Sequence, residues 1–252
     1  MFNKEIEFSS HEDYFSLKQD PPIPASLNIP EWYKKLTHEI GNFTVKGCIP
    51  FLDSLTAGYI LKVPQDFALK HNIDDKNEKG EIVKNSFCKF AMQDMQQVLF
   101  AKSINLNTHG NEVHTVNQLK ESPLNEKNKN LPIYKILNPW RIKTPKGYSC
   151  LFVPPLNNTD DRFSIIPAIV DTDQFPTEIN FPFVINGDKY PFLETIIKKG
   201  TPYVQVIPFK RDNWKFKLKP TEQKKLTCLK LFYPLKIINN YKNTYWSKKI
   251  WK

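Results

Sequence analysis

Short apolar runs separated by proline, glycine and aspartate mark the chain between residues 165 and 209. The stretch reads IIPAIVDTDQFPTEINFPFVI, then a short polar spacer, then FLETIIKKGTPYVQVIPF. Runs rich in Ile, Val and Phe that stop at turn-forming residues are typical of strands. The pattern therefore predicts several short strands in this part of the chain.

The same pattern places further strands along the chain, with helices mostly near its two ends. We expect a helix from Pro30 through Leu36 to about 40–41, because proline suits the first helical position and Glu31 the first turn. The segment Pro-Lys-Gly at 145–147 is a strong turn signal. Expected strands lie at 4–8, 43–49, 60–63, 148–153 and 203–209, a loop or hairpin tip at 70–85, and a helix at 222–231. Without βαβ alternation, this order favours a single mainly β domain.

The chain divides into three parts by composition. Residues 1–41 form an N-terminal extension with the helix, and residues 42–209 form a β-rich core domain with a polar insertion at about 70–130. Residues 210–252 form a basic, aromatic C-terminal tail, which we also expect to be helical. A length of 252 residues and an apolar content of 40% suit one large all-β domain with appendages.

Several classes of protein are disfavoured by composition. No apolar run approaches the roughly 18 residues of a membrane span, and the N-terminus lacks the apolar region of a signal peptide. The four cysteines lie far apart, which argues against a zinc site and a disulfide framework. No Gly-rich phosphate loop, G-x-S-x-G or H-E-x-x-H motif is present. We therefore expect a cytoplasmic protein without a cofactor or resident metal.

The positive charge is concentrated in the tail. The formal net charge is +10, yet residues 209–252 alone hold 13 Lys or Arg against 2 acidic residues, a charge of +11. The rest of the chain is close to neutral, with 23 basic and 24 acidic residues. A segment of this kind attracts polyanions in a salt-dependent way.

The end of the tail, NNYKNTYWSKKIWK, combines aromatic and basic residues. Tyr241, Tyr245 and Trp246 fall on roughly one helical face. Stacking on single-stranded nucleic acid, with lysines on phosphates, is one interpretation. Docking of a terminal helix on the body or on a neighbouring subunit is another, and it is the more common role of such a stripe; membrane-surface binding is a third. The candidate residues for binding a polyanion are Lys242, Trp246, Lys248 and Lys249.

Asp171 and Asp173 are the acidic pair that stands out in the β-rich core. On an extended backbone, residues i and i+2 point to the same face, where two carboxylates can hold a metal or shift each other's protonation. The sequence Asp-Thr-Asp-Gln-Phe-Pro is also good turn chemistry, so a purely structural turn is the alternative. Gln205, inside an apolar strand, must find hydrogen-bond partners on the backbone or on a ligand.

Four short segments follow one another along the chain. They are Ala57-Gly58-Tyr59, Lys146-Gly147-Tyr148, Ile169 to Asp173, and Lys199 to Gln205. This order resembles that of the dUTPase and dCTP-deaminase superfamily. The resemblance implies a jelly-roll-like β-clip barrel, usually trimeric, in which an Asp of the D-x-D segment activates water against a nucleotide. It implies a ligand-binding role for Gly58, Tyr59, Lys199 and Gln205.

The chain departs from that family at the phosphate-binding parts. Ile60 stands where the family has Asp, Tyr148-Ser149-Cys150 replaces R-S-G, and Gln174 replaces the tyrosine after D-x-D. The Gly-rich C-terminal arm of the family is replaced by the basic tail. The segments IPEWYKKL and CIPFLDSLTAGYI also resemble uncharacterised proteins of marine bacteriophages and bacteria.

These patterns lead to three functional expectations. The first is a phage-type, non-catalytic structural or interaction protein, a homo-oligomer in the host cytoplasm or the virion, with its tail on a neighbour or an anionic partner. The second is a nucleotide hydrolase in which Asp173 is the general base, Asp171 orients water or Mg²⁺, and Lys198 or Lys199 contacts phosphate. The third is a single-stranded nucleic-acid-binding protein that uses the tail.

Overall fold

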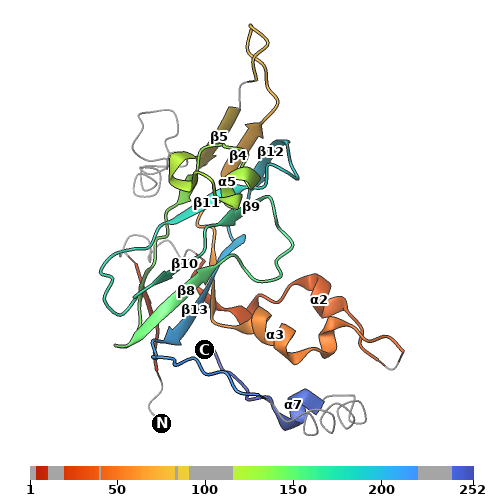
Figure 1. Ribbon diagram of the computed structural model, residues 1–252, viewed down its shortest axis with the longest axis vertical. Coiled ribbons are helices and arrows are strands. Elements are labelled where there is room, and N and C mark those ends of the chain that lie inside the picture. The colour runs from red at the N-terminus through yellow and green to blue at the C-terminus, as the bar shows by residue number, and fades with distance from the viewer. Residues whose placement is uncertain (1–3, 11–19, 40, 83–84, 91–115, 221–239) are drawn as a thin grey trace.

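The chain is mainly β in a computed structural model that describes residues 4–10, 20–39, 41–82, 85–90, 116–220 and 240–252 (Figure 1). Its strands are β1 (Glu7–Ser9), β2 (Ile23–Pro24), β3 (Tyr59–Lys62), β4 (Phe67–Asn72), β5 (Asn85–Phe90), β6 (Tyr134–Ile136), β7 (Arg141–Lys143), β8 (Tyr148–Val153), β9 (Phe163–Ile165), β10 (Ala168–Val170), β11 (Phe181–Ile185), β12 (Phe192–Ile197) and β13 (Pro202–Lys210). Its helices are η1 (Ala25–Leu27), α2 (Glu31–Lys35), η2 (Val45–Gly47), α3 (Ile49–Thr56), η4 (Val116–Leu119), α5 (Pro123–Lys127) and α7 (Asn240–Thr244).

The described strands form four antiparallel sheets. The largest has the order β10-β8-β13-β3-β2, and the others have the orders β6-β11-β9, β12-β4-β5 and β1-β7. The nine-residue strand β13 lies at the centre of the largest sheet and pairs with β3 on one side and β8 on the other. The hairpin between β4 and β5 projects from the body at one end (Figure 1).

The core lies where the sheets face each other and is rich in aromatic rings. Phe183 of β11 contacts the rings of Phe163 and Tyr134, at centroid distances of 5.4 Å and 5.7 Å. Phe67 of β4 joins this cluster through Phe163, at 5.8 Å. These large aromatic rings fill the space between the sheets and are buried from solvent. The apolar runs of the sequence thus supply the buried faces of these strands.

Several predicted elements are confirmed. The strand at 148–153 is β8, and the strand at 203–209 lies within β13. The turn at 145–147 is closed by a 3.1 Å hydrogen bond from the amide of Tyr148 to the carbonyl of Pro145, with Gly147 at φ +86°. The expected hairpin tip within 70–85 joins β4 to β5. The expected helix at 222–231 lies outside the described residues.

The prediction of a strand at 43–49 is wrong. The chain instead forms the 3-10 turn η2 and then the helix α3, in which Ile49 and Leu55 are buried. Pro50 in the first turn favours a helix there, because proline fixes φ and its missing N–H is not needed at that position. Ile49, Leu52 and Leu55 are three positions apart, so they lie on roughly one face of the helix.

The N-terminal helix is shorter than predicted. It ends at Lys35, because Leu36 is extended with ψ 137°. Lys46 donates hydrogen bonds to the carbonyls of Lys34 and Leu36, at 2.8 Å and 2.7 Å. These contacts satisfy carbonyls that a longer helix would have used internally.

A closed barrel is not found among the described residues, where the strands divide into separate sheets. Closure requires hydrogen bonds between edge strands. The edges of the largest sheet are β10 and β2, which are three and two residues long. Pro24 in β2 has no N–H to donate, which limits pairing there further. No helix in the described ranges is long and apolar enough to cross a membrane.

Candidate functional site

Asp171 and Asp173 lie in a tight turn directly after β10. The carbonyl of Asp171 accepts hydrogen bonds from the amides of Gln174 and Phe175, at 3.0 Å and 2.9 Å. Both carboxylates point toward Arg211, which follows the last residue of β13. The two residues thus lie in a turn, the alternative expected for this segment, and not on an extended strand, yet both contact Arg211.

Arg211 binds both carboxylates at once. Its Nη1 and Nη2 atoms donate to the two oxygens of Asp173 at 2.8 Å and 2.5 Å, and Nη1 lies 3.1 Å from Oδ1 of Asp171. The side chain of Asp173 is 2% exposed and that of Asp171 is 59% exposed. A planar guanidinium suits this fork-like contact better than a lysine does.

Further hydrogen bonds make this contact a junction of three strand ends. The amide of Gly147 donates to Asp173 at 2.7 Å, and the hydroxyl of Ser149 donates to Asp171 at 2.6 Å. Arg211 donates to the carbonyl of Tyr148 at 3.0 Å, and its own amide donates to the carbonyl of Gly147 at 2.9 Å. We call Gly147, Ser149, Asp171, Asp173 and Arg211 the arginine junction. It ties the end of β10 and the end of β13 to the start of β8.

The arginine junction has a defined electrostatic state. Hydrogen bonds from Arg211 and from the amide of Gly147 lower the pKa of Asp173 to about 2. The hydrogen bonds to Asp173 and the negative charges of Asp171 and Asp173 raise the pKa of Arg211. A carboxylate with so low a pKa is a weak base at neutral pH. The guanidinium also stands between the carboxylates, where its positive charge opposes a metal cation.

The metal-binding role has no further support in the described part of the chain. Those residues contain no cluster of three or more His, Cys, Asp or Glu side chains that would hold a metal ion. Two carboxylates alone leave most ligand positions of Mg²⁺ to water and substrate phosphates. The hydrolase expectation would need those phosphates to be held by other residues.

Gln205 finds its partners on the backbone, one of the two outcomes expected for it. It is 1% exposed, and its Nε2 atom donates to the carbonyls of Ser54 and Ala57 at 2.9 Å and 2.8 Å. Its Oε1 atom accepts from the amide of Leu156 at 2.9 Å. These bonds join β13 to α3 and to the loop after β8.

Gly58 and Tyr59 also contact their own chain. Gly58 has φ +68°, and a Cβ atom there would lie 1.9 Å from the carbonyl oxygen of Val206. Tyr59 contacts the rings of Phe8 and Trp251, at centroid distances of 5.2 Å and 6.2 Å. Gly58 is thus required by close packing of the backbone.

Of the candidate ligand-binding residues, Lys199 lies apart from Gly58, Tyr59 and Gln205, which are neighbours where β13 pairs with β3. The amide of Lys199 donates to Asp66 at 2.7 Å, in the turn that precedes β13. Asp66 also accepts from Lys198 at 2.8 Å. The arginine junction lies beyond the other end of β13, about 30 Å away at roughly 3.3 Å per strand residue.

The C-terminal end of the tail contacts the body. The indole N–H of Trp246 donates to the carboxylate of Asp53 in α3 at 3.0 Å, and Lys249 donates to the same carboxylate at 2.6 Å. The hydroxyl of Tyr59 donates to the carbonyl of Lys252 at 3.2 Å. Two of the four candidate polyanion-binding residues therefore contact Asp53. The other two, Lys242 and Lys248, are exposed.

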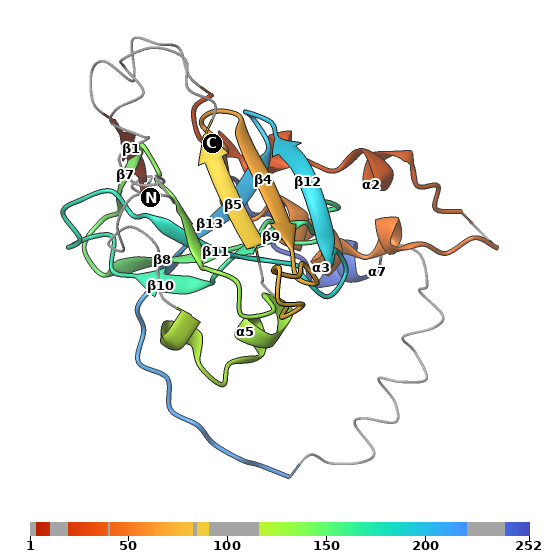
Figure 2. The ribbon, with the colours of Figure 1, turned by 90° about the horizontal axis from the view of Figure 1, so that it is seen from above.

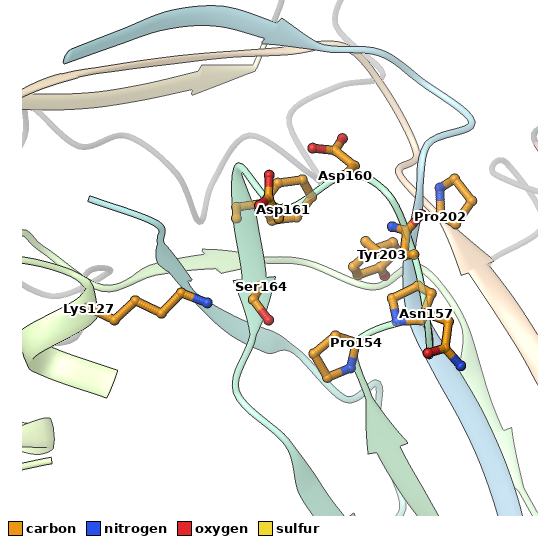
Figure 3. Close-up of a pocket in the computed structure, with 11 residues that line it drawn as sticks. Lys127, Pro154, Asn157, Asp160, Asp161, Ser164, Pro202 and Tyr203 are labelled. Carbon is orange, nitrogen blue, oxygen red and sulfur yellow. The ribbon is translucent and has the colours of Figure 1, made fainter. Parts of the chain in front are cut away.

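A small pocket that sequence patterns did not indicate lies beside the loop after β8 (Figure 3). Its volume is about 210 Å³, and Lys127, Asp160, Asp161 and Ser164 contribute polar groups to its lining. Asp160 is held by Arg162, and Asp161 by Lys189 and Tyr190; these contacts lower the pKa of each carboxyl. Ligand pockets usually measure about 300–1,000 Å³, so only a small polar molecule would fit.

The arginines are the functional signal that sequence patterns missed. The chain has 36 basic residues, and only Arg141, Arg162 and Arg211 among them are arginine. Two of the three make paired hydrogen bonds to a carboxylate, Arg162 to Asp160 and Arg211 to Asp173. In a lysine-rich chain, a lone arginine after an apolar strand is a usable sign of such a contact.

Comparison with known proteins adds no relative: no family model, no curated protein and no solved structure matches the chain.

Proposed function

We propose that this protein is a non-catalytic structural or interaction protein that works as an oligomer. In this role its C-terminal segment contacts a neighbouring subunit or an anionic partner. The observation that carries the proposal is the arginine junction, in which both candidate catalytic carboxylates are bound by Arg211 of the same chain. The groups proposed for chemistry thus serve to join strand ends.

The acid–base properties of Asp173 support this proposal. A general base works best when its pKa lies near the working pH, whereas the pKa of Asp173 is lowered to about 2. Breaking the contact with Arg211 would leave an almost completely buried carboxylate without its cation, which is unfavourable. A water-activating role would need that rearrangement before each turnover.

The finer parts of the proposal rest on sequence motifs. We propose that the sheets are a variant of the dUTPase-like jelly roll and that the protein is of phage type, in the host cytoplasm or the virion. The order of the four family-like segments supports the first point, and the segments IPEWYKKL and CIPFLDSLTAGYI support the second. A trimer is the oligomer that the same resemblance implies.

Incubation with each deoxynucleoside triphosphate and Mg²⁺ tests the non-catalytic role. We expect no turnover by the purified full-length chain. Turnover that is lost in Asp173→Asn but kept in Asp160→Asn would contradict the proposal. Asp160 is a matched control because it is also bound by an arginine, at the pocket and not at the arginine junction.

A nucleic-acid-binding role is a second candidate, because Lys242 and Lys248 are exposed beside aromatic residues. A salt titration of binding to a single-stranded oligonucleotide, by the full chain and by a chain without residues 239–252, tests it. Binding that weakens with salt and with the deletion supports this role. Binding that ignores both changes excludes it for this segment.

A further inference from the structure

Residues 212–219 form an extended segment in which apolar and basic side chains alternate. The sequence DNWKFKLK places Trp214, Phe216 and Leu218 at every second position, with lysines between and after them. These three apolar side chains are 91%, 87% and 82% exposed. Because successive side chains of an extended chain point to opposite sides, the segment has one apolar and one cationic face. We call residues 214–219 the arm.

Among the residues that the structure describes, the backbone of the arm is unpaired as well. Within the described parts of the chain, the arm has no strand partner and no hydrogen bond. It leaves the body after Arg211 and runs away from the sheets in both views (Figures 1 and 2). Free backbone groups beside an apolar face are a template for pairing with the edge of another sheet.

The edge of β12 is a matching acceptor. β12 is an edge strand in the order β12-β4-β5, and it is six residues long, as the arm is. Its outward side chains Phe192 and Ile196 are 60% and 52% exposed. Between them stands Glu194, whose side chain is 62% exposed and which accepts from Lys70 at 2.9 Å. A carboxylate has room for a second cationic donor.

Charge separates β12 from the other six-residue edge of that sheet. β5 reads NSFCKF, a sequence without an acidic partner for the lysines of the arm. β12 reads FLETII and has a glutamate. An antiparallel register that sets Lys217 opposite Glu194 also sets Phe216 opposite Thr195. The apolar face of the arm then continues the core-facing side of β12.

The arm cannot reach β12 of its own chain in this register, which sets Trp214 opposite Ile197. Arg211 is fixed in the arginine junction beyond one end of β13, whereas Ile197 lies before the turn at its other end. These ends are about 30 Å apart at roughly 3.3 Å per residue. The three residues from Arg211 to Trp214 span at most about 11 Å.

We infer that the arm of one chain adds as a further strand to the edge of β12 in a second copy of this chain, with Lys217 opposite Glu194. The inference rests on the proposed function, because it names the neighbouring subunit as the partner of the C-terminal segment. Backbone hydrogen bonds give the contact its strength, and the Glu–Lys pair fixes its register.

Charge reversal at the two partners tests the register. Glu194→Lys and Lys217→Glu, each alone, should weaken self-association about tenfold or more in sedimentation velocity, and the double variant should restore it. The control variants Glu78→Lys and Lys120→Glu reverse exposed charges outside the tail and β12, and should leave association unchanged. Single variants that associate like the wild type, or a double variant without recovery, would overturn the inference.

A cross-link tests the partner directly. Thr195→Cys and Phe216→Cys, placed in different chains that also have Cys48→Ser, should form a disulfide between chains after mixing and mild oxidation. Thr195→Cys mixed with Leu27→Cys is the control, because Leu27 is 71% exposed but outside the arm. Equal cross-linking in the two mixtures, or none in either, speaks against the inferred contact.

The outcomes separate this inference from the proposed function. An oligomer that persists in Phe216→Asp refutes the arm contact and leaves the structural role intact. Turnover of a nucleotide that depends on Asp173 refutes the proposed function whatever the arm does. A wild-type chain that stays monomeric at high concentration overturns the inference. Oligonucleotide binding that is lost in Phe216→Asp, at unchanged mass, overturns it and assigns the arm to nucleic acid.

Discussion

Arg211 separates two extended segments that have opposite surroundings. Before it, β13 pairs with β3 and β8, and its residues 203–206 are buried. After it, the arm alternates apolar and basic side chains as a half-buried strand does, yet its three apolar residues are more than four-fifths exposed. The contrast shows that alternation alone does not make a sheet strand. A free sheet edge must also lie within reach. In the inferred register, the arm cannot reach the edge of β12 in its own chain.

Substitutions in β13 and the residues packed against it should lower stability more than substitutions in the arm, most of all at Gly58. Gly58→Ala should lower the free energy of unfolding by about 3 kcal/mol or more, because a Cβ atom meets the carbonyl of Val206 at a positive φ. Gly80→Ala is the control: it also has a positive φ, of +77°, but no atom within 4 Å of the added Cβ. Urea unfolding measures both. Equal losses would show that φ, and not the contact with β13, limits Gly58.

Gln205 gives the next largest effect on the paired side. Gln205→Leu should lower the free energy of unfolding by about 2–4 kcal/mol, because two carbonyls and one amide lose their buried partner. Gln174→Leu, at an exposed position, should change it by less than about 0.5 kcal/mol. Thermal and urea unfolding measure the difference. A stable Gln205→Leu variant would mean that other groups replace these bonds.

The pH dependence of stability tests the arginine junction, which lies between the paired strand β13 and the arm. The pKa of Asp173 is about 2 in the folded chain and about 3.9 in an unfolded one. Its contribution is therefore fully present above about pH 4 and is lost as the pH falls toward 2. Asp173→Asn should be less stable than the wild type at pH 7, and the gap should close by pH 2.

Other carboxyl groups with lowered pKa values, such as Asp160 and Asp161, contribute to the acid dependence of stability equally in both proteins. The difference between the wild type and Asp173→Asn isolates the arginine junction from them. Unfolding followed by circular dichroism at several pH values measures that difference. A gap that is independent of pH would show that Asp173 stabilises the fold through packing alone.

The unpaired side should show the smallest effect on the single chain. Phe216→Asp should change the unfolding free energy by less than about 0.5 kcal/mol at concentrations where the protein is a monomer, because the side chain is 87% exposed. Its effect should be confined to self-association. A large loss of monomer stability would show that the arm packs on its own chain.

Local patterns of the sequence predicted the β strands well. The bounds of β8 and the turn before it follow from residues that are neighbours in the sequence, and so does the turn that holds Asp171 and Asp173. The identity of their partner does not, because Arg211 is 38 residues beyond Asp173. The backbone partners of Gln205 lie 49 to 151 residues away, and only the fold brings them together.

The errors also have physical reasons. The helix α3 was missed because apolar and polar residues alternate at 43–46 as in a strand, whereas Ile49, Leu52 and Leu55 are three positions apart as in a helix. The alternation in WKFKLK is visible in the sequence, but charge counting treats the segment as part of a basic tail. The apolar face of this segment became apparent only because the structure shows its apolar side chains to be exposed.

The contact of the tail with Asp53 also sets a minimum affinity that an acidic ligand needs in order to bind Trp246 and Lys249. Trp246 and Lys249 belong to the same chain as Asp53, so that carboxylate competes at an effective concentration on the order of millimolar. An acidic ligand that binds the tail too weakly to compete with Asp53 would leave the tail on the body. A peptide of residues 240–252 should accordingly bind such a ligand more tightly than the intact protein does.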